Sequence, residues 1–220
     1  IVVAGTGPAG LLAAHALSRA GFGVVLVGPE PKLDDQRTTA LMAPALDLLD
    51  RVGVLGEIAA ASAPLRTMRI VDGTGRLVRS SPVTFRAREI GKDAFGLNIP
   101  NTVLLGTITK ALTRRAGLAW RKTTVAHWRT EDDAIHADLP DGSTVSALLA
   151  IAADGRASPA REAAGISTRS RDTGQAALVL NFGHGRDHGF ISTEFDTETG
   201  PFTQVPLPGL RSSLVWVERP

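Results

Sequence analysis

The stretch that decides the fold is the start of the chain, Ile1-Val2-Val3-Ala4, which runs into Gly5-Thr6-Gly7-Pro8-Ala9-Gly10 and a helix-forming segment over residues 11–20. Four apolar residues predict a buried strand, and the glycines follow the GxGxxG spacing between a strand and a helix. In this motif the first glycine permits a tight turn, the second lets the backbone approach phosphates, and the third permits close packing of helix on strand. The helix N-terminus adds free N–H groups and partial positive charge. We therefore expect Gly5, Gly7, Pro8, Ala9 and Gly10 to hold the pyrophosphate of a dinucleotide; the alternative is a plain strand–turn–helix unit.

The composition is that of a globular protein with one domain or one and a half. The chain has 220 residues, 43% of them hydrophobic, and a formal net charge of +2, which is too small to indicate a nucleic-acid-binding surface. It has no cysteine, which excludes disulfides and Cys-based metal sites, so we expect a reducing, cytoplasmic location and assign no metal site. No apolar run approaches the ~20 residues that span a bilayer. Because it begins at Ile1 without a methionine, the chain looks trimmed at its N-terminus.

The first half of the chain continues the alternation of strands and helices. Residues 24–27 read as a second buried parallel strand, which Gly28 ends. Apolar spacing over residues 38–55 predicts a helix, with Thr38 or Thr39 as its N-cap. Residues 68–79 read as a hairpin with a glycine-rich turn, a departure from a plain doubly wound fold.

The second half changes from mixed structure to strands. Residues 101–116 predict a helix that follows a proline, and three stretches after it alternate like an antiparallel meander that ends in a buried strand: 123–128, 135–139 and 144–153. From residue 175 the strand-like stretches are 176–181, 189–195 and 213–217. The sequence thus predicts an α/β fold: a Rossmann-like dinucleotide-binding domain over 1–172 with inserted β elements around 68–90, and the beginning of a β-rich domain over 173–220.

Two further places carry candidate chemistry. Asp154 and Gly155 follow a buried strand, and the carboxyl ends of strands are where α/β sheets bind ligands. The equally weighted alternative for Asp154-Gly155 is a turn that caps a helix. Arg37, in the loop before Thr38, can direct several N–H donors at a phosphate or a flavin edge, although an isolated loop arginine is usually only solvated.

These stretches occur together in an order that resembles a known family. They are the glycine turn, Arg37-Thr38-Thr39-Ala40-Leu41, Asn101-Thr102-Val103-Leu104 and Asp154-Gly155-Arg156-Ala157-Ser158-Pro159-Ala160-Arg161. The chain resembles the FAD-dependent aromatic monooxygenases of the p-hydroxybenzoate hydroxylase type. Later stretches narrow the resemblance to the ubiquinone-biosynthesis hydroxylases, the 2-polyprenyl-6-methoxyphenol hydroxylase group. These stretches are residues 192–195, 200–202, 206–209 and 213–216. It covers essentially the whole chain.

The resemblance implies a flavin cycle, in which NAD(P)H reduces bound FAD and O₂ forms a flavin hydroperoxide that hydroxylates a phenolic ring. Its implied cofactor contacts are the glycine turn at the pyrophosphate, Arg37 with Thr38 and Asn101 along the flavin, and Asp154 and Gly155 at the dinucleotide, with Arg161 fixing their turn. No catalytic side chain is assigned, since the five histidines are scattered and none has a partner visible in the sequence.

The chain departs from the family in one local feature. An acidic residue normally ends the second strand, about twenty residues beyond the turn, and takes the ribose hydroxyls. Here that position is Gly28, and the nearest carboxylate is Glu30. Either Glu30 reaches the adenosine ribose, or water and backbone groups replace the contact.

The second departure is that the family continues past this point with another flavin-binding Gly-Asp segment and a helical region. The chain therefore looks like an N-terminal fragment, which we expect to bind FAD weakly and to hydroxylate nothing. The expected substrate is a phenol with a polyprenyl tail, which implies peripheral contact with the inner face of a membrane or with a biosynthetic complex. The alternatives are a non-catalytic nucleotide-binding scaffold and a reductase-like or halogenase-like flavoenzyme, although no halogenase lysine motif is apparent.

Overall fold

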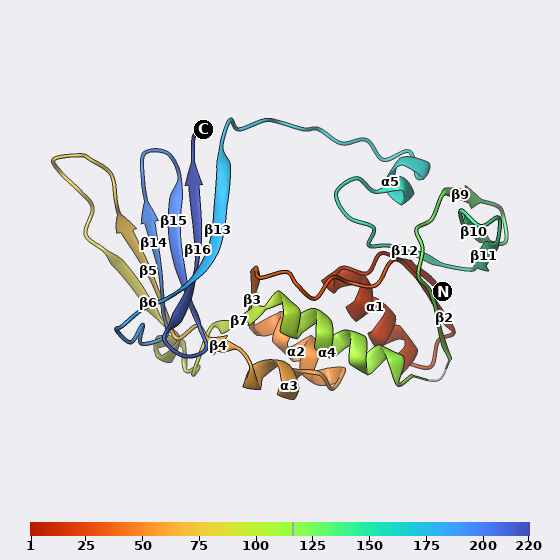
Figure 1. Ribbon diagram of the computed structural model, residues 1–220, viewed down its shortest axis with the longest axis horizontal. Helices are drawn as coiled ribbons and strands as arrows, with labels where there is room; N and C mark the ends of the chain where they lie inside the picture. Colours follow the sequence, from red (N-terminus) through yellow and green to blue (C-terminus); the bar gives the residue numbers. More distant parts are fainter. Residues whose placement is uncertain (116) are drawn as a thin grey trace. The chain divides into compact units, whose positions relative to one another are not determined.

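The computed structural model describes residues 1–115 and 117–220, which divide into two compact units (Figure 1). Neither unit is a single run of sequence: the first comprises Ile1–Leu33 and Leu104–Ser170, the second Asp34–Val103 and Arg171–Pro220. The sequence suggested contiguous domains over 1–172 and 173–220 instead. The difference lies in residues 34–103, whose strands pair with strands of the C-terminal segment.

The first unit contains the predicted parallel sheet, in the order β12-β1-β2-β8. Its strands are β1 (Val2–Ala4), β2 (Val24–Val27), β8 (Leu118–Arg121) and β12 (Ala150–Ala152), and every neighbouring pair is parallel. β1 leads through the glycine turn into α1 (Pro8–Arg19). Val2, Val3 and Leu26 are fully buried, as expected for strands covered on both faces. The short strand β8 lies just before the meander and was not predicted.

A three-stranded meander stands between β8 and β12, as the alternation of residues predicted. It consists of β9 (His127–Thr130), β10 (Ile135–Asp138) and β11 (Thr144–Ala147), all antiparallel. Ala137 and Leu139 join Val2 and Val27 in one buried apolar cluster, which fixes the meander to the parallel sheet. After β12 the chain turns into the short helix α5 (Pro159–Ala163).

The second unit corrects the helix predicted over residues 38–55. Thr38 to Met42 form strand β3, and the helix α2 covers only Ala43–Arg51, with Met42 rather than Thr38 or Thr39 at the N-cap. Pro44 explains the late start, because proline is tolerated in the first turn of a helix but not in its interior. β3 instead pairs with β7 (Gly96–Pro100), which itself pairs with β4 (Ala63–Pro64).

The remaining helices of this region are α3 and α4. α3 (Leu55–Ala60) follows α2. α4 (Asn101–Thr113) begins in the second unit directly after β7 and continues into the first. Ala116, the last residue of the helix predicted over 101–116, lies outside the described residues.

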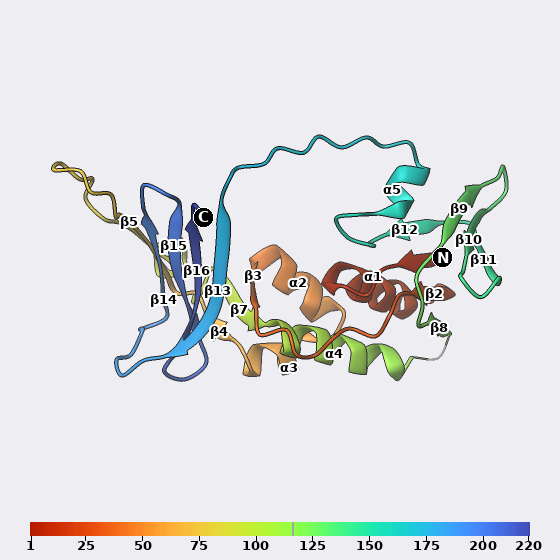
Figure 2. The ribbon, with the colours of Figure 1, turned by 45° about the horizontal axis from the view of Figure 1, so that its top comes forward.

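The second unit is dominated by a six-stranded sheet in the order β13-β16-β15-β14-β5-β6, seen from two directions in Figures 1 and 2. The strands are β5 (Thr67–Asp72), β6 (Val83–Arg86), β13 (Ala176–Gly183), β14 (Ile191–Asp196), β15 (Pro201–Leu207) and β16 (Arg211–Glu218). Only β5 and β14 pair in parallel. β15 was not predicted, because prolines at 201 and 206 argue against a strand.

The predicted hairpin exists with different bounds and a different neighbour. Its second strand is Val83–Arg86 rather than the residues just after Gly75, so a long loop joins the two strands. The hairpin extends the six-stranded sheet of the second unit, whereas the sequence suggested an insertion in the dinucleotide-binding domain. A 3₁₀ turn, η1 (Ala87–Ile90), follows it.

Candidate nucleotide-binding site

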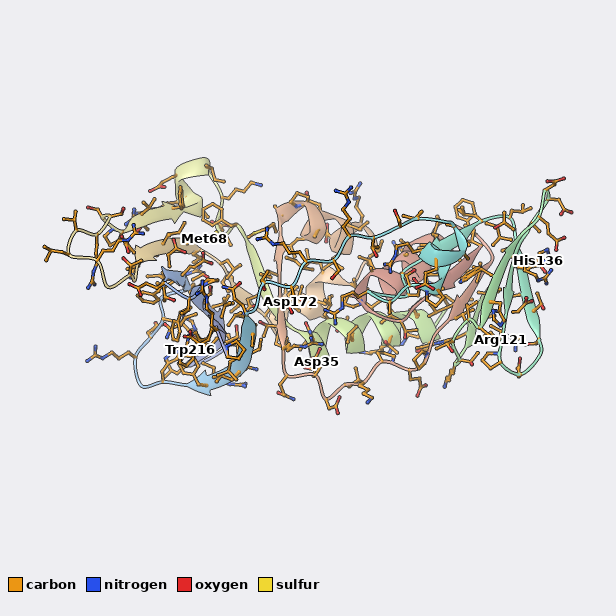
Figure 3. The ribbon with its side chains drawn as sticks, turned by 90° about the horizontal axis from the view of Figure 1, so that it is seen from above. Asp35, Met68, Arg121, His136, Asp172 and Trp216 are labelled. Carbon is orange, nitrogen blue, oxygen red and sulfur yellow. The ribbon has the colours of Figure 1, made fainter. Side chains whose placement is uncertain are left out.

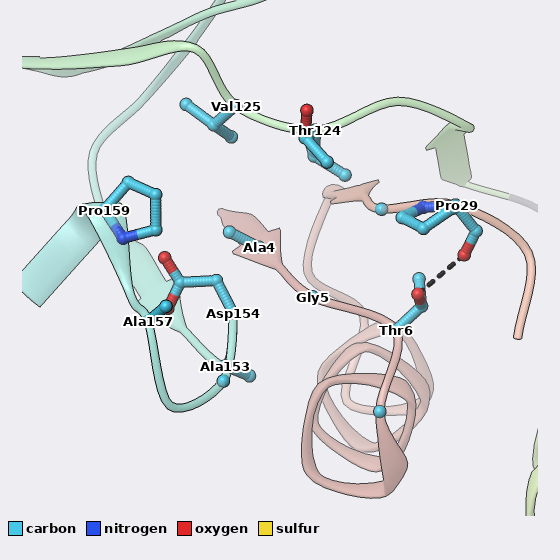
Figure 4. A pocket seen from close by; sticks show the side chains of 14 residues that line it. Ala4, Gly5, Thr6, Pro29, Thr124, Val125, Ala153, Asp154, Ala157 and Pro159 are labelled. Carbon is cyan, nitrogen blue, oxygen red and sulfur yellow. Dashed lines mark hydrogen bonds between the residues drawn. The ribbon is translucent and has the colours of Figure 1, made fainter.

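A pocket of about 590 Å³ opens at the carboxyl edge of the parallel strands in the first unit. Figure 4 shows Thr6 and Pro29 on one side of it, Asp154, Ala157 and Pro159 on the other, and Thr124 with Val125 above. The glycine turn and the Asp154 segment, far apart in sequence, are thus brought together because β1 and β12 are neighbours in the sheet. This is the edge at which parallel α/β sheets bind ligands.

The three glycines of the turn differ in what surrounds them. Gly5 has a φ of +106°, and a Cβ there would lie 2.0 Å from the Ala153 carbonyl oxygen. A Cβ on Gly10 would lie 2.0 Å from the Gly5 carbonyl oxygen. Gly7 has an ordinary φ of −70°, and a Cβ there would meet nothing within 4 Å. The fold therefore requires glycine at 5 and 10, whereas at 7 glycine only keeps the pocket open.

The adjoining end of α1 suits an anion. Pro8 stands in its first turn, the N-cap is Gly7, and the helix has neither a capping side chain nor an acidic residue there. Its free N–H groups and the positive end of its dipole remain available to a bound group. Together with the open space at Gly7, this arrangement fits the pyrophosphate of a dinucleotide.

The Asp154 segment is a capped turn that also forms part of the pocket wall. One Asp154 carboxylate oxygen accepts a hydrogen bond from Ala160 N–H at 3.1 Å, and Ser158, the N-cap of α5, accepts one from Arg161 N–H at 3.0 Å. The Arg161 guanidinium donates to the Arg156 carbonyl at 3.0 Å. Gly155, at a φ of +92°, supplies the left-handed residue of the turn. The alternative of a turn before a capped helix is therefore confirmed, and ligand binding by Asp154 and Gly155 stays a prediction.

The structure explains why β2 ends in glycine. A Cβ at Gly28 would lie 2.6 Å from the Thr6 methyl carbon, and the Thr6 hydroxyl donates to the Pro29 carbonyl at 2.6 Å. Trp120 lies on β8, which pairs with β2, and its indole N–H donates to the Gly28 carbonyl at 2.8 Å. An acidic side chain at this position is therefore excluded by Thr6, a residue that was assigned no role from the sequence.

Glu30 lies just beyond the pocket wall and forms an ion pair with Lys122. Both side chains are largely exposed, 63% and 60%, so this pair contributes little to stability. The predicted contact between Glu30 and a ribose stays a prediction, and Lys122 is the side chain with which a ribose would compete.

The other predicted cofactor residues form a hydrogen-bonded group in the second unit, centred on Asp35 (labelled in Figure 3). Arg37 donates to both Asp35 carboxylate oxygens, from Nε at 2.9 Å and from Nη2 at 3.0 Å. Asn101 Nδ2 donates to Asp35 at 2.8 Å, and the Thr39 hydroxyl donates to Asn101 Oδ1 at 2.7 Å. Thr38 lies apart from this group and donates to the Ser213 hydroxyl at 3.2 Å.

Asp35 is the residue that the sequence did not single out, although it stands two positions before Arg37. The hydrogen bonds from Arg37 and Asn101 hold the pKa of its carboxyl well below the usual range. Its side chain is 20% exposed, whereas that of Arg37 is 69% exposed and keeps Nη1 without a partner among the described residues. Asp35 thus fixes two predicted flavin-contact residues and leaves one arginine donor group for a ligand.

Within the described residues, no group of three or more His, Cys, Asp or Glu side chains is placed to hold a metal ion. The helices of the same part of the chain are all too short or too polar to cross a membrane.

Comparison with known proteins identifies the family. The profile of the FAD-binding domain family matches residues 1–187. The chain belongs to this FAD-binding family. Members of this family bind FAD, a dinucleotide of the kind that the pocket at the glycine turn fits. The match covers that pocket and both predicted cofactor segments.

Two relatives of this chain are hydroxylases of ubiquinone biosynthesis by name. Ubiquinone hydroxylase UbiL of Rhodospirillum rubrum is 34% identical over the whole of this chain and 52% of its own length. The 3-demethoxyubiquinol 3-hydroxylase of Escherichia coli is 27% identical over the whole of this chain and 57% of its own. The chain thus spans about half the length of these curated relatives. They confirm the resemblance to the ubiquinone-biosynthesis hydroxylases of the FAD-dependent monooxygenase class.

Solved structures confirm the fold. The crystal structure of Pseudomonas aeruginosa PqsL with 2-aminobenzoylacetate superimposes with a TM-score of 0.83, at 20% identity, over the whole of this chain and 60% of PqsL. At this identity the likeness concerns architecture alone.

Proposed function

We propose that this chain forms the FAD-binding part of a monooxygenase that hydroxylates a phenolic ring in ubiquinone biosynthesis. The observation that carries the proposal is the open space at Gly7, next to the uncapped N-terminus of α1 and inside a pocket of about 590 Å³. No described residue lies within 4 Å of a Cβ at position 7, so this space is available to a ligand. The family identifies that ligand as FAD.

The residues of the pocket bind and orient the cofactor. Gly5, Gly7 and the first turn of α1 hold the pyrophosphate, while Asp154 and Gly155 form the opposite wall. Arg161 and Ser158 keep that wall in one conformation through their hydrogen bonds within the turn. Bound FAD, reduced by NAD(P)H, supplies the activation of O₂.

Arg37 and Asn101 are the residues proposed to contact the flavin. Asp35 fixes the guanidinium of Arg37 in one orientation and leaves its Nη1 without a partner among the described residues. Asn101 is held by Asp35 and Thr39, so its side chain is likewise fixed before the cofactor arrives. Such preorganisation lowers the entropy that binding costs.

The relatives' names support the substrate class that we propose. A ubiquinone precursor is a phenol with a polyprenyl tail, so the complete protein meets the inner face of a membrane peripherally or receives its substrate within a biosynthetic complex. The chain spans about half of its relatives' length, and by itself we expect it to bind FAD weakly and to hydroxylate nothing.

Turnover measurements test this function. The complete protein is expected to purify with flavin and to consume NAD(P)H and O₂ when given a polyprenyl phenol, whereas the 220-residue chain is expected to give no hydroxylated product. Robust NADPH-driven hydroxylation by the 220-residue chain would refute the expectation that this chain alone is inactive. A complete protein that is colourless and does not bind FAD would favour the scaffold instead.

The ribose contact has a separate test. If Glu30 binds the adenosine ribose, Glu30→Ala weakens FAD binding, and Lys122→Ala strengthens it by releasing the carboxylate from its ion pair. Equal FAD affinity in Glu30→Ala and the wild type would assign the ribose to backbone groups and water.

A further inference from the structure

A second pocket, of about 570 Å³, lies in the second unit and is lined mainly by cationic side chains. Of the described residues that line it, Arg66, Arg86, Arg88 and Lys92 are cationic and Asp93 alone is acidic. Its formal charge excess of three exceeds the +2 of the entire chain. We refer to these five residues as the basic pocket.

Most of these cations have no carboxylate partner. Arg86 forms an ion pair with Glu89 at 3.3 Å. Among the described residues, Arg66, Arg88 and Lys92 form no ion pair, so their charges remain available to a ligand. Surface cations in a protein of near-zero net charge are commonly interspersed with acids, and this concentration departs from that pattern.

The backbone that carries the cations is fixed. The Arg86 N–H donates to the Glu89 carboxylate at 3.1 Å, the Lys92 N–H donates to the Ala87 carbonyl at 3.0 Å, and Ala87 itself is buried. The Ala87 N–H in turn donates to the Arg66 carbonyl at 3.0 Å, which ties the turn to β5. The pocket is therefore built from three sequence segments held in one arrangement.

Backbone strain occurs at Phe190, the residue after Gly189, which lines this pocket. Among the described residues, Phe190 is the one non-glycine residue with a positive φ, 57°, and its carbonyl accepts hydrogen bonds from both Arg66 N–H and Thr67 N–H. The Phe190 N–H donates to His188 Nδ1 at 3.1 Å, and His188 Nε2 donates to the Leu207 carbonyl at 3.0 Å. The Phe190 ring then supports the Arg66 guanidinium, 4.7 Å from the ring centroid.

Strained residues of this kind persist where surrounding contacts over-determine them, and they concentrate at ligand sites. Here the strain places an aromatic ring under Arg66 and thereby orients a planar guanidinium that has no carboxylate to hold it. The strain and the charge excess are independent observations that point to the same place.

We propose that the basic pocket binds a phosphate group of a larger molecule. Arginine pairs match the geometry of phosphate oxygens, and three or four cations match the charge of a phosphate monoester or a diphosphate. The volume exceeds that of one phosphoryl group, so the ligand extends beyond it. Two kinds of molecule carry such a phosphate group, a nucleotide and a phospholipid headgroup. The proposal does not depend on the function proposed for the glycine turn.

Binding of inorganic pyrophosphate, measured by calorimetry, tests the site. We expect the double variant Arg88→Gln/Lys92→Gln, which keeps Arg66 on Phe190, to bind pyrophosphate at least tenfold more weakly. The matched control is Arg76→Gln/Arg79→Gln, which removes the same charge from the exposed loop between β5 and β6. It is expected to stay within twofold of the wild type. Pyrophosphate that binds at the glycine turn is common to all three proteins, so the difference between the two double variants reports the basic pocket alone.

Two further titrations distinguish the sources. If the wild type binds 2′,5′-ADP and Arg88→Gln/Lys92→Gln does not, the ligand is a nucleotide phosphate. If the wild type cosediments with phosphatidylglycerol vesicles but not with phosphatidylcholine vesicles, and the double variant cosediments with neither, the ligand is a lipid headgroup. Equal pyrophosphate affinity in the two double variants, or no pyrophosphate binding by the wild type, would overturn the proposal.

Discussion

At the residue scale, the three glycines of the glycine turn differ in the space around them. Gly5 and Gly10 avoid backbone contacts that a Cβ would make at 2.0 Å, whereas Gly7 faces open space. The GxGxxG spacing predicted both the turn and a separate role for each glycine, but it could not identify the atoms involved, since the close contact at Gly5 is with Ala153, far along the chain.

Substitution by alanine separates the two roles. Gly10→Ala is expected to lower the free energy of unfolding by roughly 2 kcal/mol or more, since its Cβ overlaps backbone that cannot easily move. Gly7→Ala is expected to change it by less than about 0.5 kcal/mol. Urea denaturation followed by circular dichroism measures both. Similar losses in the two variants would show that Gly7 is structural.

The contact between Gly28 and Thr6 predicts a coupled pair. Gly28→Ala places a methyl group 2.6 Å from the Thr6 methyl carbon and is expected to cost roughly 1–3 kcal/mol of stability. Thr6→Ser removes that carbon and keeps the hydroxyl, so the double variant should recover part of the loss. A double-mutant cycle measures the recovery, and strict additivity would mean that Thr6 does not exclude side chains at position 28.

The Asp35 group predicts a pH-dependent difference in stability. Because the folded-state pKa of Asp35 is depressed, its stabilising effect is complete above the unfolded-state pKa and declines as the pH falls below it. Asp35→Asn is expected to be about 1 kcal/mol less stable than the wild type at neutral pH. The difference should shrink below about pH 4. Denaturation series at several pH values measure it; a difference that grows on acidification would contradict the assignment.

At the element scale, periodicity predicted the elements whose neighbours lie in the adjoining sequence. β1, α1, β2, the meander and α4 were expected. The segment Thr38–Met42 was misread as helix because its partner is β7, nearly sixty residues later, and no local pattern reports that pairing. β15 was missed because its two prolines disfavour a strand. They stand at its first residue and near its end, so the middle of the strand can still pair with its neighbours.

The helix α5 has five residues and therefore depends on its cap. Ser158→Ala removes the hydrogen bond to Arg161 N–H and is expected to cost about 1 kcal/mol. Because this turn forms one wall of the pocket at the glycine turn, FAD affinity should fall several-fold as well. Thermal denaturation and FAD titration measure the two effects; Ser80→Ala, on the exposed β5–β6 loop, is the control expected to leave both unchanged.

At the scale of the whole molecule, the chain passes from one unit to the other three times, after Leu33, Val103 and Ser170. Residues 34–103 leave the first unit, supply β5 and β6 to the six-stranded sheet, and return through α4. The parallel pairing of β5 with β14 joins residues more than a hundred positions apart. Sequence patterns identified the strands on both sides of this pairing, but the pairing itself depends on tertiary contacts, and so the domain division could not be predicted from them.

The candidate site follows the same rule. Each segment of the site was predictable, because glycine spacing and the Asp-Gly pair are local signals. Asp35, Thr6 and the basic pocket were not, because their significance arises only when hydrogen bonds and strand neighbours bring distant residues together.

The central claim is that the pocket at the glycine turn binds FAD, and the most direct test is an equilibrium titration followed by flavin fluorescence. Wild-type protein is compared with Gly7→Ala and with Gly56→Ala, a matched change at an exposed glycine in α3 that also has open space around it. We predict saturable FAD binding by the wild type, at least tenfold weaker binding by Gly7→Ala, and binding within twofold of the wild type by Gly56→Ala. Equal affinities in all three proteins, or no saturable binding by the wild type, would contradict the claim.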